Sequence, residues 1–180
     1  MDKTKWIVLT YSLPTEPSRP RVAIWRALKK IGAVNIQQSM WVLPDHADHL
    51  AALQKICLDI EAGQGEALLM ESAFYDEAHA QRVMDLFNKV RDEEYSEFIH
   101  ECEKYLLEIR KEIDKEKFVF AELEEEEAEF DKLSAWYLKI AARDLFHSSC
   151  MTEAAEKRRR IEAAIEGYSQ MVFEHETTFE

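Results

Sequence analysis

The spacing of apolar residues along the chain changes near residue 75. Before that point, short β-favouring runs alternate with amphipathic helices. Residues 6–11 are almost all β-branched or aromatic and prolines follow them, so they predict a buried strand with a sharp end. Apolar residues then recur at helical spacing up to Gly32, which predicts a helix that begins near Ser18.

Residues 34–43 favour strand, but three polar residues interrupt them, which predicts two strands that meet at a bulge or tight bend. A second helix follows, with Asp45 as its expected N-cap and with an apolar face formed by Leu50, Leu53, Cys57 and Ile60. Residues 67–74 are the last strand candidate. The order β-α-β-β-α-β predicts an α+β fold, with a small ferredoxin-like sheet domain over residues 1–75.

From residue 76 onward the apolar residues keep helical spacing. Three stretches, 83–113, 123–140 and 154–172, each predict a helix. The separations alternate between three and four, as in helices that pack at shallow angles. We therefore expect residues 76–180 to form a long helical hairpin or three-helix bundle. We also expect it to pack on the sheet domain, because a small sheet exposes an apolar face unless something covers it.

Composition places the chain among folded, non-membrane proteins. Apolar residues make up 47% of its 180 residues, enough for one sizeable core or for a small domain with an appended bundle. It contains no run of about 18 apolar residues that could span a bilayer. The first five residues lead straight into the first strand rather than into a signal-peptide core, so a cytoplasmic location is expected.

The net charge of −13 is unevenly distributed. Residues 1–75 carry eight cations and eight anions, so the whole net charge lies in residues 76–180. Phosphate is repelled by so acidic a chain, and any nucleic-acid contact therefore requires a local basic patch. No acidic residue lies between Glu16 and Asp45, whereas five cations do. The candidate nucleic-acid-binding residues are these cations and two glutamines at the strand bend: Arg19, Arg21, Arg26, Lys29, Lys30, Gln37 and Gln38.

An ordinary solvated face is the alternative reading of this patch, because cations near a helix C-terminus also complement the helix dipole. The denser cluster at residues 157–160 has acidic neighbours three or four residues away, which favours pairing within the chain. His46 and His49 are spaced for a metal but lack further ligands, so we predict no metal site.

The aromatic and sulfur-containing residues are most simply structural. Three tryptophans, Trp25, Trp41 and Trp136, are in phase with the apolar residues around them and are expected in the core. The cysteines are three in number and far apart in the sequence, so reduced, buried thiols are expected. Neither a phosphate-binding glycine loop nor a nucleophile motif is present, and we predict no enzymatic activity and no cofactor.

Two segments, WIVLTYSLPTEP at residues 6–17 and RVAIWRALKKIGAV at residues 21–34, followed by SMWVLP at residues 39–44, resemble the opening of the ChrB chromate-resistance regulators. The segment IAARDLF at residues 140–146 is also similar to that family. The resemblance implies DNA binding by this N-terminal portion and a regulatory link to chromate resistance. It also implies a second, anion-sensing domain, so a protein that supplies such a domain is a candidate partner.

The opening is similar to the central domain of PaaX-type repressors and to ferredoxin-like CRISPR adaptation nucleases as well. Those nucleases place a metal-binding aspartate after the first strand, where this chain has Tyr11 and Ser12. A degenerate metal-dependent nuclease is therefore the weaker alternative. A different alternative is a protein-interaction or oligomerisation module that uses the acidic helical extension. Candidate partners are thus DNA and a second copy of the chain.

Overall fold

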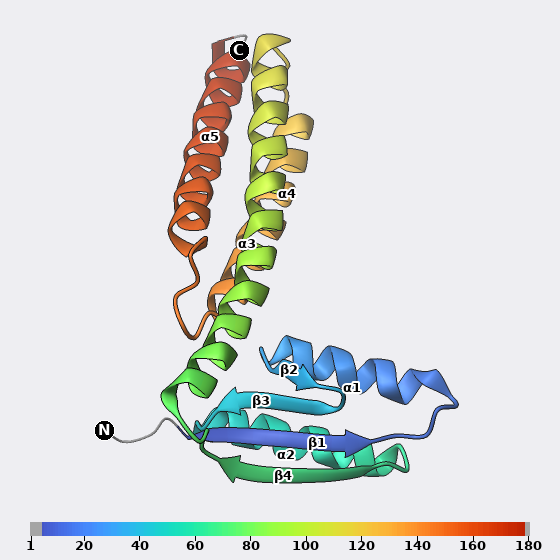
Figure 1. Cartoon of the computed structure of the whole chain (residues 1–180). Coiled ribbons are helices and arrows are strands. Elements are labelled where there is room, and N and C mark those ends of the chain that lie inside the picture. Colours follow the sequence, from blue (N-terminus) through green and yellow to red (C-terminus); the bar gives the residue numbers. More distant parts are fainter. Residues whose placement is uncertain (1–4, 179–180) are drawn as a thin grey trace. The chain divides into compact units, whose positions relative to one another are not determined.

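The computed structural model describes residues 5–178, and its chain divides into two compact units, residues 1–87 and 88–180. The division falls inside one long helix (Figure 1). Residues 1–4, which bear on the expectation of no signal peptide, lie outside the described residues. No helix in the described part of the chain has a stretch apolar enough to cross a membrane.

The first unit contains a four-stranded antiparallel sheet with two helices. Its strands are β1 (Trp6–Ser12), β2 (Val34–Gln37), β3 (Met40–Pro44) and β4 (Glu66–Ser72), and its helices are α1 (Ser18–Lys30) and α2 (Ala47–Ala62). The strand order is β2-β3-β1-β4, so each strand-helix-strand crossover skips one strand. This arrangement confirms the predicted ferredoxin-like topology.

β1 lies in the middle of the sheet and supplies much of its core. It pairs with β3 on one edge and with β4 on the other. Its first four side chains are all buried: Trp6, Ile7, Val8 and Leu9. Side chains on both faces of this strand are therefore removed from water, which explains why its sequence is continuously apolar instead of alternating.

Helices α1 and α2 bury regular stripes. Ile24 and Leu28 are buried on α1. On α2 the buried residues are Leu53, Ile56 and Ile60. The prediction that Leu50 and Cys57 complete this stripe was wrong, since Leu50 is exposed and Cys57 is half-buried. A helix advances by about 100° per residue, so burial of Ile56 in place of Cys57 rotates the buried face away from the predicted one.

The N-terminus of α2 also differs from the prediction. His46, not Asp45, is the N-cap, and its Nδ1 accepts a hydrogen bond of 3.3 Å from the backbone N–H of Asp48. The backbone N–H of Asp45 instead donates to the Lys5 carbonyl at 2.9 Å. Asp45 thus continues the pairing beyond the end of β3, and the helix begins one residue later than a cap at Asp45 requires.

The first turns of α3 (Glu77–Asp114) belong to the first unit. The ring of Trp6 lies 5.4 Å from that of Phe74 and 6.0 Å from that of Phe87, centroid to centroid. Val83 and Phe87 are buried. Aromatic packing therefore fixes the start of the extension to the first residue of β1. The predicted packing of the remaining residues, up to 180, on the sheet stays a prediction.

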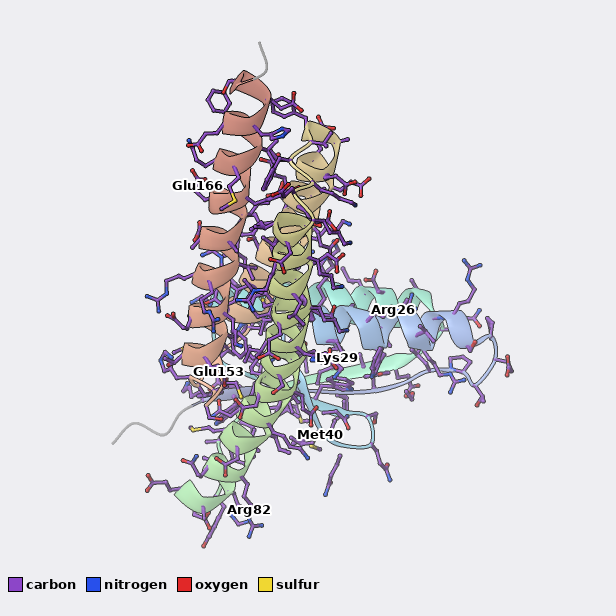
Figure 2. All side chains as sticks on the ribbon, turned by 90° about the horizontal axis from the view of Figure 1, so that it is seen from above. Arg26, Lys29, Met40, Arg82, Glu153 and Glu166 are labelled. Carbon is purple, nitrogen blue, oxygen red and sulfur yellow. The ribbon has the colours of Figure 1, made fainter. Side chains whose placement is uncertain are left out.

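The second unit consists of the rest of α3 together with α4 (Phe120–Ala141) and α5 (Met151–Thr178), which confirms the predicted three helices. Its core contains residues from all three, including Phe98, Leu133 and Ile161. Two buried tyrosines bond to backbone carbonyls of neighbouring segments: Tyr105 to Glu126 at 3.0 Å and Tyr168 to Lys117 at 2.5 Å. Glu153 and Glu166 are exposed on α5 (Figure 2).

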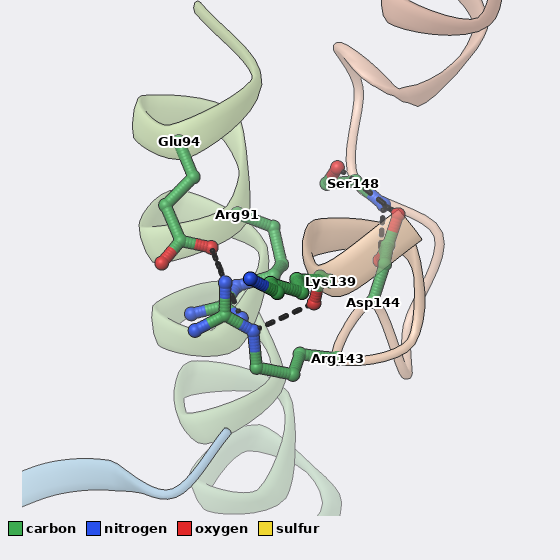
Figure 3. A network of polar contacts seen from close by, with 6 residues as sticks. All are labelled: Arg91, Glu94, Lys139, Arg143, Asp144 and Ser148. Carbon is green, nitrogen blue, oxygen red and sulfur yellow. Dashed lines mark hydrogen bonds and ion pairs between the residues drawn. The ribbon is translucent and has the colours of Figure 1, made fainter. Parts of the chain in front are cut away.

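A polar network joins α3 to the end of α4 (Figure 3). Arg143 donates from Nη2 to Glu94 at 3.1 Å and from Nε to the Lys139 carbonyl at 2.8 Å. Arg91 is buried and lies 3.2 Å from the same Glu94 carboxylate. Burial lowers the pKa of the Arg91 guanidinium, and the Glu94 charge opposes that shift. An ion pair with one buried partner adds little net stability, because the cost of desolvating the charge offsets much of the attraction.

The cysteines are free thiols, as predicted, but only Cys102 is buried. Cys57 and Cys150 are half-buried, so the prediction that all three are buried was wrong. Burial raises the pKa of the Cys102 thiol to about 12. This thiol is therefore protonated and unreactive at neutral pH.

We predict opposite effects of alanine at two glycines. A Cβ at Gly65 would overlap the Ser12 carbonyl oxygen and lie 2.8 Å from Ile60 Cγ2, whereas a Cβ at Gly167 on α5 meets nothing within 4 Å. Gly65→Ala should lower the free energy of unfolding by about 1–3 kcal/mol through overpacking. Gly167→Ala should raise it by about 0.5–1 kcal/mol through helix propensity. Chemical denaturation of the two variants measures both effects, and equal effects would contradict the close packing of the turn before β4.

Candidate nucleic-acid interface

Helix α1 carries the predicted basic patch. Its first turn contains no acidic residue, and Lys29 and Lys30 lie in its last turn. Ile31 is the C-cap of the helix, and Gly32, at a φ of 83°, donates its N–H to the Lys29 carbonyl at 3.0 Å. Only glycine adopts such a backbone conformation without strain, which explains the sharp end of the helix.

The five cations of this segment, Arg19, Arg21, Arg26, Lys29 and Lys30, are called the α1 cations below. Four of them are exposed and Lys29 is half-buried. The side chains of Arg26, Lys29 and Lys30 share a face at spacings of three and four residues, and Figure 2 labels the first two. The buried side chains of Ile24 and Leu28 hold the opposite face against the rest of the unit.

The α1 cations differ from most other cations of the chain in their charge partners. Among the described residues, none forms an ion pair with Arg19, Arg21, Arg26 or Lys30. Elsewhere more than half of the described lysines and arginines are paired with carboxylates, often three residues away on the same helix, although some exposed ones, such as Lys89 and Arg110, are not. Examples of the pairs are Lys104 with Glu101 at 2.6 Å, Lys111 with Glu108 at 2.9 Å and Lys132 with Glu129 at 2.9 Å.

Trp25 is exposed, contrary to the prediction that it lies in the core. Its exposed fraction is 49%, whereas that of Trp41 is 5% and confirms the prediction there. Trp136 is half-buried against the core of the second unit, where its ring lies 5.8 Å from that of Phe98. Trp25 follows buried Ile24 by one residue, and the rotation of the helix between them turns its ring outward. The Lys29 ammonium lies 5.6 Å from the centroid of this ring.

The two predicted glutamines lie at the turn between β2 and β3. Gln37 ends β2, and Gln38 has a φ of 40°, a left-handed conformation. The Asn35 side chain holds this turn by donating to the carbonyls of Gln38 at 2.6 Å and Met40 at 3.1 Å. This arrangement confirms the predicted bend in residues 34–43.

An open surface groove of about 470 Å³ lies at this turn. Its lining residues are Thr10, Gln37, Gln38, Ser39 and Met40. The structure thus brings the two glutamines together in one groove. The α1 cations are not among its lining residues, so the predicted set divides into a charged helix and an uncharged groove on a separate element.

The other predicted clusters behave as structural features. Lys157 pairs with Glu103 of α3 at 2.5 Å, and Arg159 pairs with Glu156 at 2.8 Å. Arg158 lies 5.6 Å from the centroid of the Tyr137 ring. Pairing within the chain was predicted for this cluster, although the Lys157 partner is on another helix.

The side chains of His46 and His49 both contact backbone atoms. His49 Nδ1 lies 2.8 Å from the Pro44 carbonyl oxygen, and His46 caps α2. In the described part of the chain, no group of three or more His, Cys, Asp or Glu side chains could hold a metal.

Fold and surface together define an α+β protein with a ferredoxin-like domain, a cationic helix on that domain and a three-helix extension. The sequence model of the family described as "Protein ChrB, N-terminal" matches residues 21–179. The chain belongs to this family.

A curated relative supports the same assignment. "Protein ChrB" of Cupriavidus metallidurans is 29% identical over 99 residues, which are 55% of this chain. The aligned residues span 30% of the length of that relative.

We predict that Trp25 accounts for most of the quenchable tryptophan fluorescence. Trp6 and Trp41 are buried and Trp136 is half-buried, so acrylamide should reach Trp25 more readily than any of the other three. Trp25→Phe should lower the Stern–Volmer constant and shift the emission to shorter wavelengths. It should change the free energy of unfolding by less than about 0.5 kcal/mol, as is usual for surface substitutions. An unchanged quenching constant would show that the ring is covered in solution.

Proposed function

We propose that this chain is a non-enzymatic DNA-binding module of a chromate-resistance regulatory system, and that the α1 cations contact DNA phosphates. Its family membership supports the link to ChrB proteins. The observation that carries the DNA-binding part is a set of exposed cations, Arg19, Arg21, Arg26 and Lys30, without a described carboxylate partner in a chain of net charge −13.

The positions of these cations on α1 favour phosphate binding over a purely structural role. Lys29 and Lys30 lie at the C-terminal end of the helix, where cations complement the dipole. Arg19 and Arg21 lie in the first turn, where the dipole disfavours cations and no acidic residue compensates them. Helix stability alone therefore does not account for these two arginines, whereas an incoming phosphate would be bound by them and by the helix N-terminus together.

The charge of the remaining chain sets the expected character of binding. The net charge of −13 lies in residues 76–180 and repels a polyanion at long range. Contacts by the α1 cations must overcome this repulsion locally, so binding should be weak and should depend steeply on salt. The link to chromate sensing rests on the family alone, and we propose that anion sensing requires a further domain.

Charge removal on α1 should change the salt dependence of DNA binding. For the triple variant R26Q/K29Q/K30Q, the slope of log K against log salt should fall in magnitude by about 0.9 for each phosphate that the variant no longer neutralises. Binding of a fluorescent duplex, measured by anisotropy over a range of salt concentrations, gives both slopes.

The matched control is K104Q/K111Q/K132Q. It also removes three positive charges, but from lysines of the second unit that pair with glutamates three residues away. Its slope should equal that of the unmodified chain. Equal slopes for all three proteins would refute phosphate contact by α1, and an absence of binding at low salt would refute DNA binding by the isolated chain.

A second candidate function is a protein-interaction or oligomerisation module. An open groove of about 350 Å³ between α3 and α4 is lined by five glutamates and one lysine, together with Tyr105 and Leu133. Burial raises the pKa of Glu126 in this groove, and neighbouring glutamates add to the shift. So concentrated a negative charge suits a basic segment of a partner protein. Light scattering tests the homodimer that this function includes.

A further inference from the structure

Trp25 occupies a position on the patch that phosphate binding does not explain. Nearly half of its surface is open to solvent, although tryptophan is the largest apolar side chain. Phosphate binding requires cations and hydrogen-bond donors, not an aromatic ring. The ring therefore indicates a second kind of contact in the same place.

The neighbours of Trp25 on the helix surface are cationic. Arg21 lies four residues before it and Lys29 four residues after it, so each is about one helical turn away along the same face. The Lys29 ammonium is 5.6 Å from the ring centroid, within cation–π range. A second stripe beside the first contains Val22, which is 42% exposed, followed by Arg26 and Lys30.

An aromatic ring between cations matches the way in which proteins bind unpaired nucleotides. Bases stack on the ring while the flanking phosphates contact the cations. Within an intact duplex the faces of the bases are covered by their neighbours, and only their edges are accessible in the grooves. A duplex can therefore use the α1 cations but not the face of Trp25.

We propose that Trp25 is a stacking platform for an unpaired nucleobase, and that α1 binds single-stranded nucleic acid more tightly than an intact duplex of the same length. This inference rests on the proposed function, because it requires the α1 cations to contact phosphates. It adds the class of ligand: a strand with exposed bases, such as an open or distorted segment of DNA.

Groups elsewhere on the first unit are compatible with that ligand. The turn at Gln37 and Gln38 presents uncharged hydrogen-bonding side chains at an open groove. Such side chains can bond to the edges of a base that has no pairing partner. The absence of acidic residues between Glu16 and Asp45 leaves residues 17–44 without a carboxylate that would repel the strand.

The test compares three short ligands of equal length at one salt concentration: a thymidine single strand, an abasic strand with the same phosphates, and a blunt duplex. The full chain should bind the thymidine strand most tightly. Trp25→Leu should weaken that binding by about fivefold or more, the range for loss of one base–aromatic stack. The affinity of this variant for the abasic strand and for the duplex should stay within about twofold of that of the unmodified chain. A neutral surface substitution usually has an effect of about this size or less.

Two further variants separate stacking from other effects. Trp25→Phe keeps an aromatic ring and should restore most of the binding to the thymidine strand. Leu58→Ala, at a residue that is 65% exposed on α2 in the same unit, should change nothing. The thymidine strand should also quench the fluorescence of the unmodified chain, the abasic strand should not, and Trp25→Phe should lose most of this quenching.

Several results would overturn the inference. Equal affinity for the thymidine and abasic strands, or an equal loss on all three ligands in Trp25→Leu, would show that the ring does not stack on a base. A change in oligomeric state of Trp25→Leu, detected by light scattering, would assign the ring to a protein interface instead. If the stacking inference fails but the chain still binds the duplex, the proposed function is still supported. If the chain binds none of the three ligands, both the inference and the proposed function are refuted.

Discussion

The fold of the first unit depends on the central position of β1. This strand is hydrogen-bonded along both edges and its first four side chains are buried, so it can be neither an edge strand nor a surface strand. Its partners β3 and β4 run antiparallel to it on either side, and the chain crosses through α1 to reach β2 at the far edge. Buried Ile24 and Leu28 fix one face of α1, and the cations are left on the solvent side.

The cations on α1 differ from many of those in the second unit in whether they have carboxylate partners. In the second unit many lysines and arginines are balanced by carboxylates, as in the pairs of Lys157 with Glu103 and Arg143 with Glu94. Such pairs occupy these cations with partners inside the second unit and leave fewer of them available for an external anion. On α1 the opposite holds, because Arg19, Arg21 and Arg26 are exposed and without a described carboxylate partner. A chain that is acidic as a whole thus keeps a local group of exposed cations on α1, which is the basis of the proposed phosphate contact.

Much of the fold could be predicted from the sequence because its patterns have short periods. The continuous apolar run of β1, the polar interruption at Gln37 and Gln38, and the three helices after residue 76 are all visible in local spacing. The outward direction of Trp25 was not predicted, because hydrophobicity was taken as evidence of burial while the helical phase places the ring beside Arg21 and Lys29. The network of Arg143 with Glu94 could not be predicted either, since 49 residues separate its members and only the tertiary fold brings them together.

The central claim is that nucleic acid contacts the α1 cations through its phosphates, while the β2–β3 turn supplies hydrogen bonds to its bases. Amide chemical shifts of the isotopically labelled chain, recorded during titration with a single-stranded oligonucleotide at low and then at high salt, test it most directly. The account predicts that the largest changes occur at residues 19–30 and 37–38, that the Trp25 indole N–H resonance shifts with them, and that all of them vanish at high salt. Changes confined to α3, α4 and α5, or changes that persist unaltered at high salt, would contradict it.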